Sequence, residues 1–575
     1  MQHWARLGAF VSLCFFILAF LFVNQSYAQT DDPRYYDIGN PTVVDIFLDP
    51  VNGNDANDGS SRASALKTLQ AAWYLIPYDT VLSTGYRINI LPGVLPCASY
   101  CSNWFAQRYG TYQFPIIIRA ADGRGTVTIQ GGLNFYSVNF LYLIDLNIVA
   151  GNGVGAFSNN VIHFDRVYHL LMRGLTLTGL NPVEFQEVVK ANQCQVIYLE
   201  DSDISGARSS VVDFFAVQWG HIVNNRIHDS GSWGMYLKGG SAYFRIEGNE
   251  IYNCLLGFSA GEGSTLSYLE PPFLHYEVYD IKFINNVLHD LPGTALMVAG
   301  GYNVLLAHNT LYRIGYASPR SYGLFTVSHG GRVCYDTDGS CKRLTDQGAW
   351  GPSQLEDAFS SYVIPNRNVF IYNNVFYNPA PYRTADLHMV VYGAAIKPAT
   401  FQNLPDYLPT DENLQIRGNV IWNGPSNTLL GIEYDVMGCK PSNPTCNADQ
   451  LRADNTINVV EPQFRDPANE DFHLLPDSNL AKAVSLAIPD FGWADAPSVP
   501  LGNLSNSVGR DRDNSTRAQI NPPGAYTIPA AVVPAANSAA AVSAASYRSP
   551  VAAESLVAAF GVNLSPTTAT AATSP

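Results

Sequence analysis

Charged side chains are scarce in this sequence. They make up 14% of the 575 residues, against 47% hydrophobic residues, and the formal net charge is −15. This acidic balance excludes a general affinity for nucleic acid or for anionic membrane surfaces, because both attract positive charge. It does not exclude an acidic polysaccharide, since a local basic surface or a bridging calcium ion would override the global charge.

Long apolar runs are scarce as well, and the one that occurs lies at the N-terminus. It covers residues 7–23, follows Arg6, and precedes Ser26-Tyr27-Ala28, which has the small residues of a cleavage site. We expect residues 1–28 to be a signal peptide, with an uncleaved membrane anchor as the alternative. The sequence offers no other span, so the mature protein is expected to be secreted or held at the cell surface.

The sequence lacks any C-x-x-C pair, which disfavours a zinc site of the cysteine type. Removing Cys14 with the signal leaves eight cysteines, and an even number in an exported chain indicates disulfides. Cys194 and Cys254 have no near neighbour, and are expected either to pair across the fold or to stay buried and free. The other six form close pairs that each close one loop: Cys97/Cys101, Cys334/Cys341 and Cys439/Cys446.

A repeated asparagine motif dominates the middle of the chain. The residues that mark successive units are spaced by 23, 24, 37 and 23 positions, at Ile204, Ile227, Ile251, Leu288 and Leu311. A period of about 23 residues with short alternating apolar runs indicates one supersecondary unit stacked many times. We expect each asparagine to lie in a tight turn and to bond to its equivalent one coil away, forming a ladder. The asparagines are Asn225, Asn249, Asn286, Asn309, Asn374 and Asn419.

These units resemble a known family of repeats. Asn249-Glu250-Ile251-Tyr252-Asn253, Asn286-Val287-Leu288-His289-Asp290 and Tyr236-Leu237-Lys238-Gly239-Gly240-Ser241 are similar to the right-handed parallel β-helix repeats of the pectate-lyase-like superfamily. The resemblance covers roughly residues 43–527 and implies an all-β solenoid with an N-terminal helix cap and long loop inserts. The superfamily contains lyases, glycosidases, epimerases, tailspikes and adhesins, so the fold does not name the reaction.

The patterns divide the chain into regions. Residues 29–130 are expected to form the N-terminal cap and first coils, residues 131–430 the parallel β-helix, and residues 431–527 the last coils and C-terminal cap. Residues 528–575 are rich in Ala, Ser, Pro and Thr and predict a disordered linker. Part of that linker resembles the truncated start of an immunoglobulin-like TIG module.

The N-terminal cap is predicted from a short amphipathic helix. Leu66, Leu69 and Trp73 share one face, which would cover the open end of the solenoid. Asp55 and Asp58 precede this helix, and a polar turn is the favoured interpretation over a calcium site.

The signatures of the common enzymes with this fold are missing. Polygalacturonase-type proteins carry a clustered aspartate pair and a Gly-His-Gly. The only adjacent aspartates here are Asp31-Asp32, at the start of the mature chain, and Ser328-His329-Gly330-Gly331 matches the Gly-His-Gly motif only in part. The Trp-Ile-Asp-His and Arg-x-Pro-x-x-Arg runs of the common pectate lyase family are absent. So are a nucleophile elbow and an H-E-x-x-H motif.

A candidate site forms around Lys238. Strand alternation places Tyr236 and Lys238 outward, on the face opposite to Met235 and Leu237. Neighbouring coils, stacked at about 4.8 Å, are expected to bring Asp213 and Glu262 onto the same outer face. A slip of one residue would turn Asp213 inward. The alternative for Lys238 is a solvent-facing lysine beside a Gly-Gly turn.

The resemblance implies roles for these residues. In calcium-assisted lyases of this fold, a metal held by carboxylates acidifies the C5 proton of a uronate, and a lysine with a lowered pKa removes it. Lys238 and Asp213 are then the catalytic residues and calcium the cofactor. The metal is assigned to Glu262, Glu277 and Asp280, and substrate binding to Tyr236, Tyr268, Phe273, Tyr276 and His329.

The sequence therefore predicts a monomeric exported protein that acts on or binds a polysaccharide. A calcium-assisted lyase is one reading. A non-catalytic carbohydrate-binding or adhesin-like surface protein is an alternative from another class, and a glycoside hydrolase is a further one.

Overall fold

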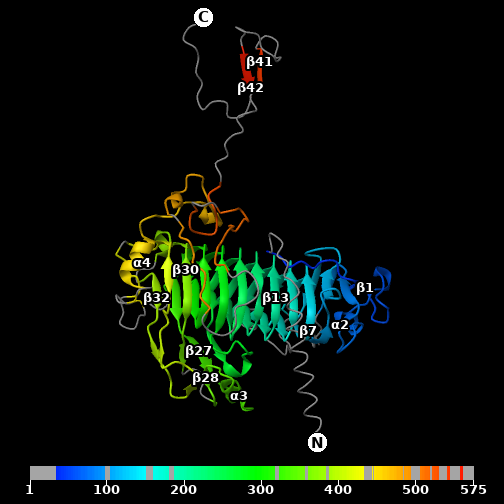
Figure 1. Ribbon diagram of the computed structural model, residues 1–575. Coiled ribbons are helices and arrows are strands. Elements are labelled where there is room, and N and C mark those ends of the chain that lie inside the picture. Colours follow the sequence, from blue (N-terminus) through cyan, green and yellow to red (C-terminus); the bar gives the residue numbers. More distant parts are fainter. Residues whose placement is uncertain are drawn as a thin grey trace.

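The structure of the protein is a computed structural model (Figure 1). It describes residues 34–96, 104–150, 160–179, 187–317, 323–355, 361–383, 387–425, 427–432, 439, 443, 446–483, 485–493, 505–517 and 521–529, and the two strands 540–543 and 557–560. The predictions for the signal peptide and for Cys97/Cys101 lie outside these residues. So does most of the TIG-like segment, of which β41 (Ala540–Ser543) and β42 (Val557–Phe560) form an antiparallel pair. None of the described helices is long and apolar enough to cross a membrane.

The body of the molecule is a solenoid in which one 31-stranded sheet winds through three faces, and every pairing within it is parallel. We name the faces sheets A, B and C. Sheet A is made of β1 (Val43–Leu48), β2 (Gly85–Ile90), β5 (Ile116–Ala120), the end of β7 (Leu133–Ile144), β10 (Tyr168–Arg173), β13 (Gln195–Glu200), β16 (Gln218–Val223), β18 (Ser241–Glu247), β21 (Val278–Ile284), β24 (Gly301–Ala307), β30 (Arg367–Tyr372) and β36 (Gln415–Arg417).

Two long strands pass from sheet B into sheet C. Sheet B contains β3 (Gly93–Leu95), β6 (Val127–Gln130), β8 (Asn147–Val149), β11 (Thr176–Thr178), β14 (Asp203–Ala207), the starts of β17 (Arg226–Lys238) and β19 (Glu250–Ala260), β22 (Val287–Leu291), β25 (Thr310–Ile314), β31 (Val375–Tyr377), β37 (Val420–Trp422) and β38 (Thr456–Ile457). Sheet C contains β4 (Trp104–Tyr109), the start of β7, β9 (Ile162–Asp165), β12 (Glu187–Asn192), β15 (Ser210–Phe215), the ends of β17 and β19, β23 (Leu296–Ala299), β26 (Phe325–Ser328) and β32 (Met389–Val391). The predicted three-faced parallel solenoid is confirmed.

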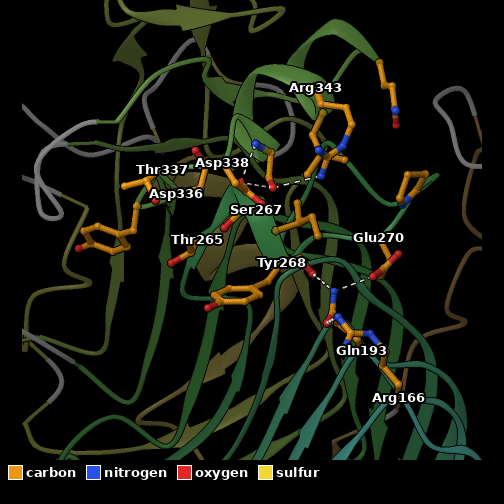
Figure 2. A pocket seen from close by; sticks show the side chains of 16 residues that line it. Arg166, Gln193, Thr265, Ser267, Tyr268, Glu270, Asp336, Thr337, Asp338 and Arg343 are labelled. Carbon is orange, nitrogen blue, oxygen red and sulfur yellow. Dashed lines mark hydrogen bonds between the residues drawn. The ribbon is translucent and has the colours of Figure 1, made fainter. Parts of the chain in front are cut away.

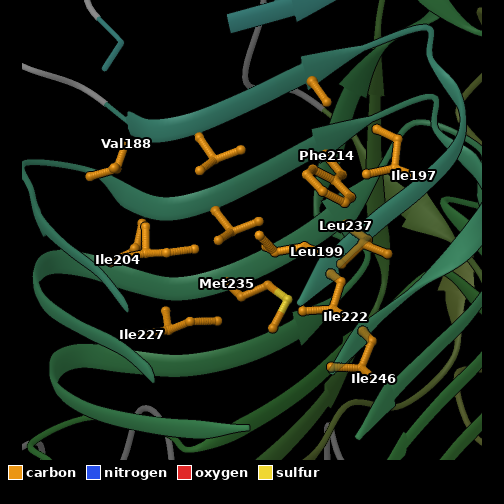
Figure 3. Close-up of a cluster of buried hydrophobic side chains, with 14 of the residues drawn as sticks. Val188, Ile197, Leu199, Ile204, Phe214, Ile222, Ile227, Met235, Leu237 and Ile246 are labelled. Atoms are coloured by element: carbon orange, nitrogen blue, oxygen red, sulfur yellow. The ribbon is translucent and has the colours of Figure 1, made fainter. Parts of the chain in front are cut away.

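The core is built by residues at equivalent positions of successive coils, which stack on one another. Ile204, Ile227 and Ile251 pair in register along sheet B, as their spacing predicted. Met235 and Leu237 point inward with them and are fully buried (Figure 3). Because inward side chains follow a period of two, each strand gives two or three apolar residues to one continuous core.

The asparagine ladder is present along the turn between sheets A and B. Each rung donates from its amide nitrogen to the side-chain oxygen of the next, over 2.8–3.1 Å. The same oxygen also accepts the backbone N–H of the preceding rung. The ladder continues one rung beyond the prediction, to Asn455 at the end of α4 (Ala448–Asp454). At its other end the hydroxyl of Ser202 takes the place of the amide.

The predicted N-terminal helix is shorter than expected. α2 spans Leu69–Tyr74 and follows the 3-10 turn η1 (Arg62–Ser64), while Leu66 instead bridges to Leu48. Leu66, Leu69 and Trp73 are all buried. The carboxylate of Asp55 accepts the backbone N–H groups of Lys67 and Thr68, over 2.8 and 2.9 Å. This use of Asp55 corresponds to the polar turn.

Long inserts build a second layer over part of sheet C. One small sheet joins β20 (Gly263–Thr265), β27 (Gly330–Val333) and β29 (Tyr362–Ile364), beside η2 (Leu266–Tyr268) and α3 (Ser340–Asp346). Two antiparallel pairs complete the layer, β28 (Gly351–Pro352) with β34 (Phe401–Gln402) and β33 (Ala395–Ile396) with β35 (Tyr407–Leu408); η3 is Ala380–Tyr382.

The C-terminal segment lies along the side of the solenoid. The hairpin of β39 (Phe464–Asp466), η4 (Pro467–Asn469) and β40 (Asp471–Leu474) packs Phe464 and Phe472 on the outer side of sheet B. After η5 (Asn479–Lys482), Phe491 packs on Phe370 of sheet A, with ring centroids 4.9 Å apart. The segment thus covers two faces rather than the end of the solenoid alone.

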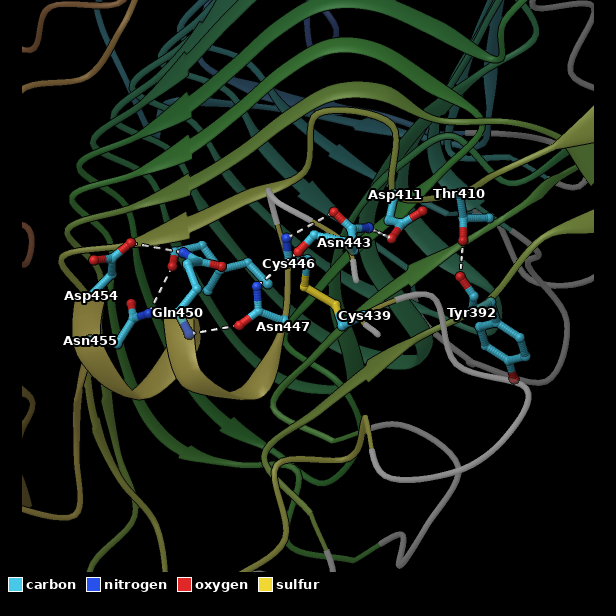
Figure 4. The surroundings of a disulfide bond; sticks show 11 residues. Tyr392, Thr410, Asp411, Cys439, Asn443, Cys446, Asn447, Gln450, Asp454 and Asn455 are labelled. Carbon is cyan, nitrogen blue, oxygen red and sulfur yellow. Dashed lines mark hydrogen bonds between the residues drawn. A yellow bond between two sulfur atoms is a disulfide. The ribbon is translucent and has the colours of Figure 1, made fainter. Parts of the chain in front are cut away.

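Two of the predicted disulfides are present. Cys334–Cys341 closes the loop before α3, and Cys439–Cys446 lies before α4. Figure 4 shows the second bond beside Asn443 and Asn447, and the side chain of Asn447 caps α4 by accepting the Gln450 N–H over 2.9 Å. Cys194 and Cys254 are buried and free, one of the two outcomes expected for them.

Candidate functional site

The outer side of sheet C carries a column of polar residues. Register places His163, Lys190, Asp213, Tyr236 and Ser259 on successive strands, one beside the other. Asp213 therefore faces outward, as expected, but it pairs with Tyr236, and Lys238 lies beside Phe215.

Asp213 is the buried centre of this column. Its side chain is fully buried, forms an ion pair with Lys190, and accepts a hydrogen bond from the Tyr236 hydroxyl over 2.6 Å. The second oxygen of the carboxylate has no hydrogen-bond partner. Lys190 was not identified from the sequence.

Lys238 lies at the edge of the same cluster and is mostly buried. Its ammonium contacts the Glu262 carboxylate at 2.9 Å and lies 4.5 Å from the centre of the Tyr236 ring. Burial opposes the charge on Lys238, but Asp213 and Glu262 outweigh burial and raise its pKa. The structure thus brings Lys238, Asp213 and Glu262 together as predicted, with the lysine as a protonated ammonium in the free protein.

Glu187, at the start of β12, is a buried acid of the cluster. Burial raises the pKa of this carboxyl to about 7, with Lys190 and Lys238 opposing the shift. Burial also raises the pKa of Tyr236, and the charges of Asp213, Glu262 and Glu187 all add to the effect. Three carboxyl groups therefore surround one tyrosine, and the pKa of one of them, Glu187, lies near neutral pH.

The Glu187→Gln variant is expected to be more stable than the wild type at alkaline pH. The folded pKa of about 7 lies above the ordinary value of 4.5, so the fold favours the protonated form. Its stabilising effect is complete below about pH 4.5 and is lost as pH rises through 7. Glutamine does not ionise, so Glu187→Gln keeps the stability that the wild type loses. Its free energy of unfolding should exceed that of the wild type by up to ~3 kcal/mol above pH 8 and by little at pH 4.5.

Thermal unfolding of both proteins between pH 4.5 and 9 measures this difference. Glu262→Gln is the matched control, because its carboxylate is one-third exposed and already paired with Lys238. A difference in Tm between Glu187→Gln and the wild type that stays constant with pH would contradict the assignment.

Two of the predicted metal ligands form ion pairs with other residues instead. Glu277 is fully buried and accepts from Arg332 through Nε and Nη2, at 3.0 and 2.6 Å, and from the Gly239 N–H at 3.1 Å. Asp280 lies on sheet A, because the chain turns the corner of the coil at Val278. Its carboxylate is 3.7 Å from Lys282. The structure does not bring Asp280 to Lys238.

The predicted aromatic wall is mostly packed inside the protein. Phe273 and Tyr276 are buried against sheet A, where Tyr276 stacks on Tyr302 at 4.9 Å. His329 is also buried and bonds to the Leu408 carbonyl at 3.2 Å. Tyr236 is buried and donates its hydroxyl to Asp213. Of the five predicted substrate contacts, Tyr268 alone is open, with 57% of its surface exposed.

Tyr268 lines a pocket of about 800 Å³ next to the cluster (Figure 2). The pocket lies between η2, α3 and the turns that follow β9 and β12, and Gln193 bridges its floor by donating to Glu270 at 2.6 Å. Tyr268 packs edge-on against Phe215, at 6.0 Å, and Phe215 is the neighbour of Lys238 in register. The pocket and the polar cluster therefore adjoin.

A pair of stacked aromatic rings lies toward the N-terminal end of sheet C. Trp104 and Tyr136 stack at 5.7 Å with an angle of 22° between their planes, and 43% of Trp104 is exposed. The guanidinium of Arg166 lies 5.9 Å from the Tyr136 ring. Open aromatic faces of this kind pack against sugar rings. No repeat pattern marked this pair in the sequence.

Comparisons with known proteins agree with this architecture. The family model for the right handed beta helix region matches residues 162–335. The protein contains a right-handed parallel β-helix. That stretch includes Lys190, Asp213, Lys238 and Glu262.

The solved structures that this chain is similar to are distant. A rhamnogalacturonan lyase is 12% identical, with a TM-score of 0.36, over 66% of this chain and 87% of its own. XylC in complex with xylose is 8% identical, with a TM-score of 0.47, over 84% and 98%. The pectate lyase Pel9A is 14% identical, with a TM-score of 0.29, over 85% and 98%. The search of curated proteins gave no match.

Proposed function

We propose that this β-helix protein is an exported enzyme that hydrolyses glycosidic bonds of a polysaccharide on the outer face of sheet C. The observation that carries the proposal is Glu187, a 4% exposed carboxyl with a pKa of about 7 among charged groups. A carboxylic acid that keeps its proton near neutral pH is the proton donor that glycoside hydrolysis needs. Two disulfides support export.

The chemistry needs two carboxyl groups in opposite protonation states. Glu187 donates its proton to the glycosidic oxygen as the bond to the anomeric carbon breaks. Glu262, one-third exposed and paired with Lys238, takes the proton of the attacking water. Asp213 is already bound by Lys190 and by the Tyr236 hydroxyl, so we assign it to positioning these two side chains and not to contact with the sugar.

The protein offers two exposed aromatic surfaces for sugar rings on this side of the molecule. The Trp104–Tyr136 stack lies on β4 and β7, and Tyr268 lies against Phe215 of β15, between the strands that carry Glu187 and Lys238. A chain that spans several coils would contact both, which favours a polymer over a small sugar. Sugar chains of neutral or of acidic units both fit this chemistry.

The test measures new reducing ends on a panel of neutral and uronate-containing polysaccharides. Glu187→Gln is expected to lower kcat by ~10²–10⁴-fold, the range for a lost general acid. Wild-type activity should fall above about pH 7 as Glu187 loses its proton. Glu412→Gln, an exposed acid paired with Arg367 on the edge of sheet A, is the control and should keep full activity. Full activity in Glu187→Gln would end the proposal.

A calcium-assisted lyase with Lys238 as its base is the second candidate. The specific observation in its favour is that Asp213 and Glu262, the groups that raise the pKa of Lys238, are carboxylates that a bound calcium ion would neutralise. A lyase leaves unsaturated uronides that absorb in the ultraviolet, needs calcium, and should lose activity in Lys238→Ala. A hydrolase produces reducing ends without ultraviolet absorbance, and it stays active when a chelator is added.

A non-catalytic carbohydrate-binding protein is the remaining outcome. In that case no product forms, and Trp104→Ala weakens binding to a polysaccharide while Glu187→Gln leaves it unchanged.

A further inference from the structure

A second cluster of metal-ligating groups lies on sheet B, away from the polar cluster of sheet C. Glu250 of β19, His289 of β22 and Glu470 of the C-terminal hairpin place one ligand atom each within 4.8 Å of the others. His289 is fully buried, Glu250 is mostly buried, and Glu470 is exposed. The cluster thus joins two adjacent coils to a segment distant in sequence.

The imidazole of His289 is held in one orientation. Its Nδ1 is 2.8 Å from the Asp290 carboxylate, and its ring stacks on Tyr252 with centroids 5.0 Å apart and planes 2° from parallel. Phe472 of the hairpin closes the other side, at 5.6 Å. With Nδ1–H donated to Asp290, Nε2 is the ring atom that remains as a ligand, and it lies within 4.8 Å of one oxygen of each glutamate.

The Nε2 atom has no hydrogen-bond partner although it is buried. It lies 3.4 Å from Oε1 of Glu250, beyond ordinary hydrogen-bond length. Two ligands bound to a tetrahedral zinc at about 2.0–2.1 Å lie about 3.4 Å from each other, because the angle between the bonds is fixed. The spacing of the two atoms is therefore that of metal ligands.

We propose that Glu250, His289 and Glu470 bind a first-row divalent transition cation, of which Zn²⁺ is the best fit. The ligands are His289 Nε2, one oxygen each from Glu250 and Glu470, and a solvent molecule on the open side. One imidazole and two carboxylates suit zinc, whereas calcium requires six or more oxygen ligands. The Asp290–His289 pair is the carboxylate–histidine arrangement that supports metal-bound imidazoles.

The positive charges that act on Glu250 are those of Arg226 and Arg512, and Arg512 donates its hydrogen bonds to the Gly248 carbonyl and the Tyr526 hydroxyl. Glu250 uses its other oxygen, Oε2, for Arg226 at 3.3 Å, so Oε1 still faces His289. Asp290 is neutralised by Arg313 at 2.7 Å, which fixes it as an acceptor for the imidazole. Glu470 follows η4 in a left-handed conformation (φ 64°), at the tip of the hairpin.

The bound cation would fasten the C-terminal hairpin to the solenoid. Phe464 and Phe472 already pack the hairpin on sheet B, and the cation adds a bond from its tip to β19 and β22. Because the cation binds the folded form, it raises stability by mass action. This role is independent of the chemistry proposed for sheet C.

The test uses the full mature chain without a metal-binding tag, freed of metal by chelation and titrated with ZnCl₂ by calorimetry. We expect one zinc per chain and a rise in Tm that EDTA reverses. Glu470→Gln should weaken zinc binding at least tenfold and abolish the rise, since Glu470 is exposed and its amide keeps the fold. Asp477→Asn, an exposed acid in the same segment, is the matched control and should bind as the wild type does.

Cobalt(II) gives a second readout of the same site. A four-coordinate site with imidazole should produce visible absorption bands in the wild type that His289→Gln and Glu470→Gln lack. The proposal fails if the wild type binds no zinc, if Glu470→Gln binds zinc as tightly as the wild type, or if CaCl₂ gives the same rise in Tm as ZnCl₂.

Discussion

Replacing Glu277 by Ala is expected to destabilise the protein by about 3–5 kcal/mol, because removing one partner leaves a fully buried Arg332 without its counter-charge. Arg332 donates to both insert loops, through the carbonyls of Leu274 at 3.4 Å, His275 at 3.3 Å and Trp350 at 2.8 Å. Glu277 also accepts the Gly239 N–H, directly after Lys238. The pair therefore ties the inserts to the coil that carries the site.

Chemical or thermal unfolding of Glu277→Ala measures the loss. Glu262→Ala, which removes a one-third exposed partner of Lys238, is the control and should cost less than about 1 kcal/mol. The double variant Glu277→Leu/Arg332→Met should recover part of the loss, since no charge is then left buried. Equal destabilisation by Glu277→Ala and Glu262→Ala would contradict the role of the buried pair.

Asn309→Ala is expected to lower the free energy of unfolding by about 3 kcal/mol, because it leaves several buried polar groups without hydrogen-bond partners at once. The Asn309 amide donates to the Phe283 carbonyl at 3.1 Å and to Asn374 at 2.9 Å. Its oxygen accepts both the N–H and the side-chain amide of Asn286, at 2.9 and 3.1 Å. Water cannot replace these bonds, since all three rungs are fully buried.

Ser202→Ala provides the comparison at the end of the ladder. The Ser202 hydroxyl makes two hydrogen bonds, accepting from Leu175 N–H at 3.1 Å and donating to the Glu200 carbonyl at 2.8 Å. Its loss should cost about 1 kcal/mol. If Asn309→Ala and Ser202→Ala unfold at the same denaturant concentration with equal slopes, the ladder does not carry the stability assigned to it.

The sequence predicted those features that local chemistry decides. Inward and outward residues follow from strand alternation, so the burial of Met235 and the outward position of Lys238 could be derived from five residues. The asparagine rungs follow from turn chemistry repeated at one period. Stacking these units in register was then enough to bring Lys238 to Glu262.

Features decided by long-range packing were not predictable in this way. Phe273 and Tyr276 have the composition of a sugar-binding wall, but the second insert covers them through Trp350. Asp280 is close to Glu277 in sequence, yet the corner of the coil places it on sheet A. Glu187 looks like an ordinary acid at the start of a strand, and only its burial beside Lys190 and Lys238 sets it apart.

The asparagine ladder makes the stacking of the coils independent of the length of their loops. The ladder runs along the turn between sheets A and B, whereas the inserts leave the coils next to sheet C. Each rung spans the same gap whether its coil has 23 residues, as from Asn286 to Asn309, or 65, as from Asn309 to Asn374. A loop next to sheet C can therefore lengthen, shorten or change its composition while the hydrogen bonds of the asparagine ladder stay intact. The solenoid thus holds a constant frame along one corner of its coils and carries loops of very different length along another.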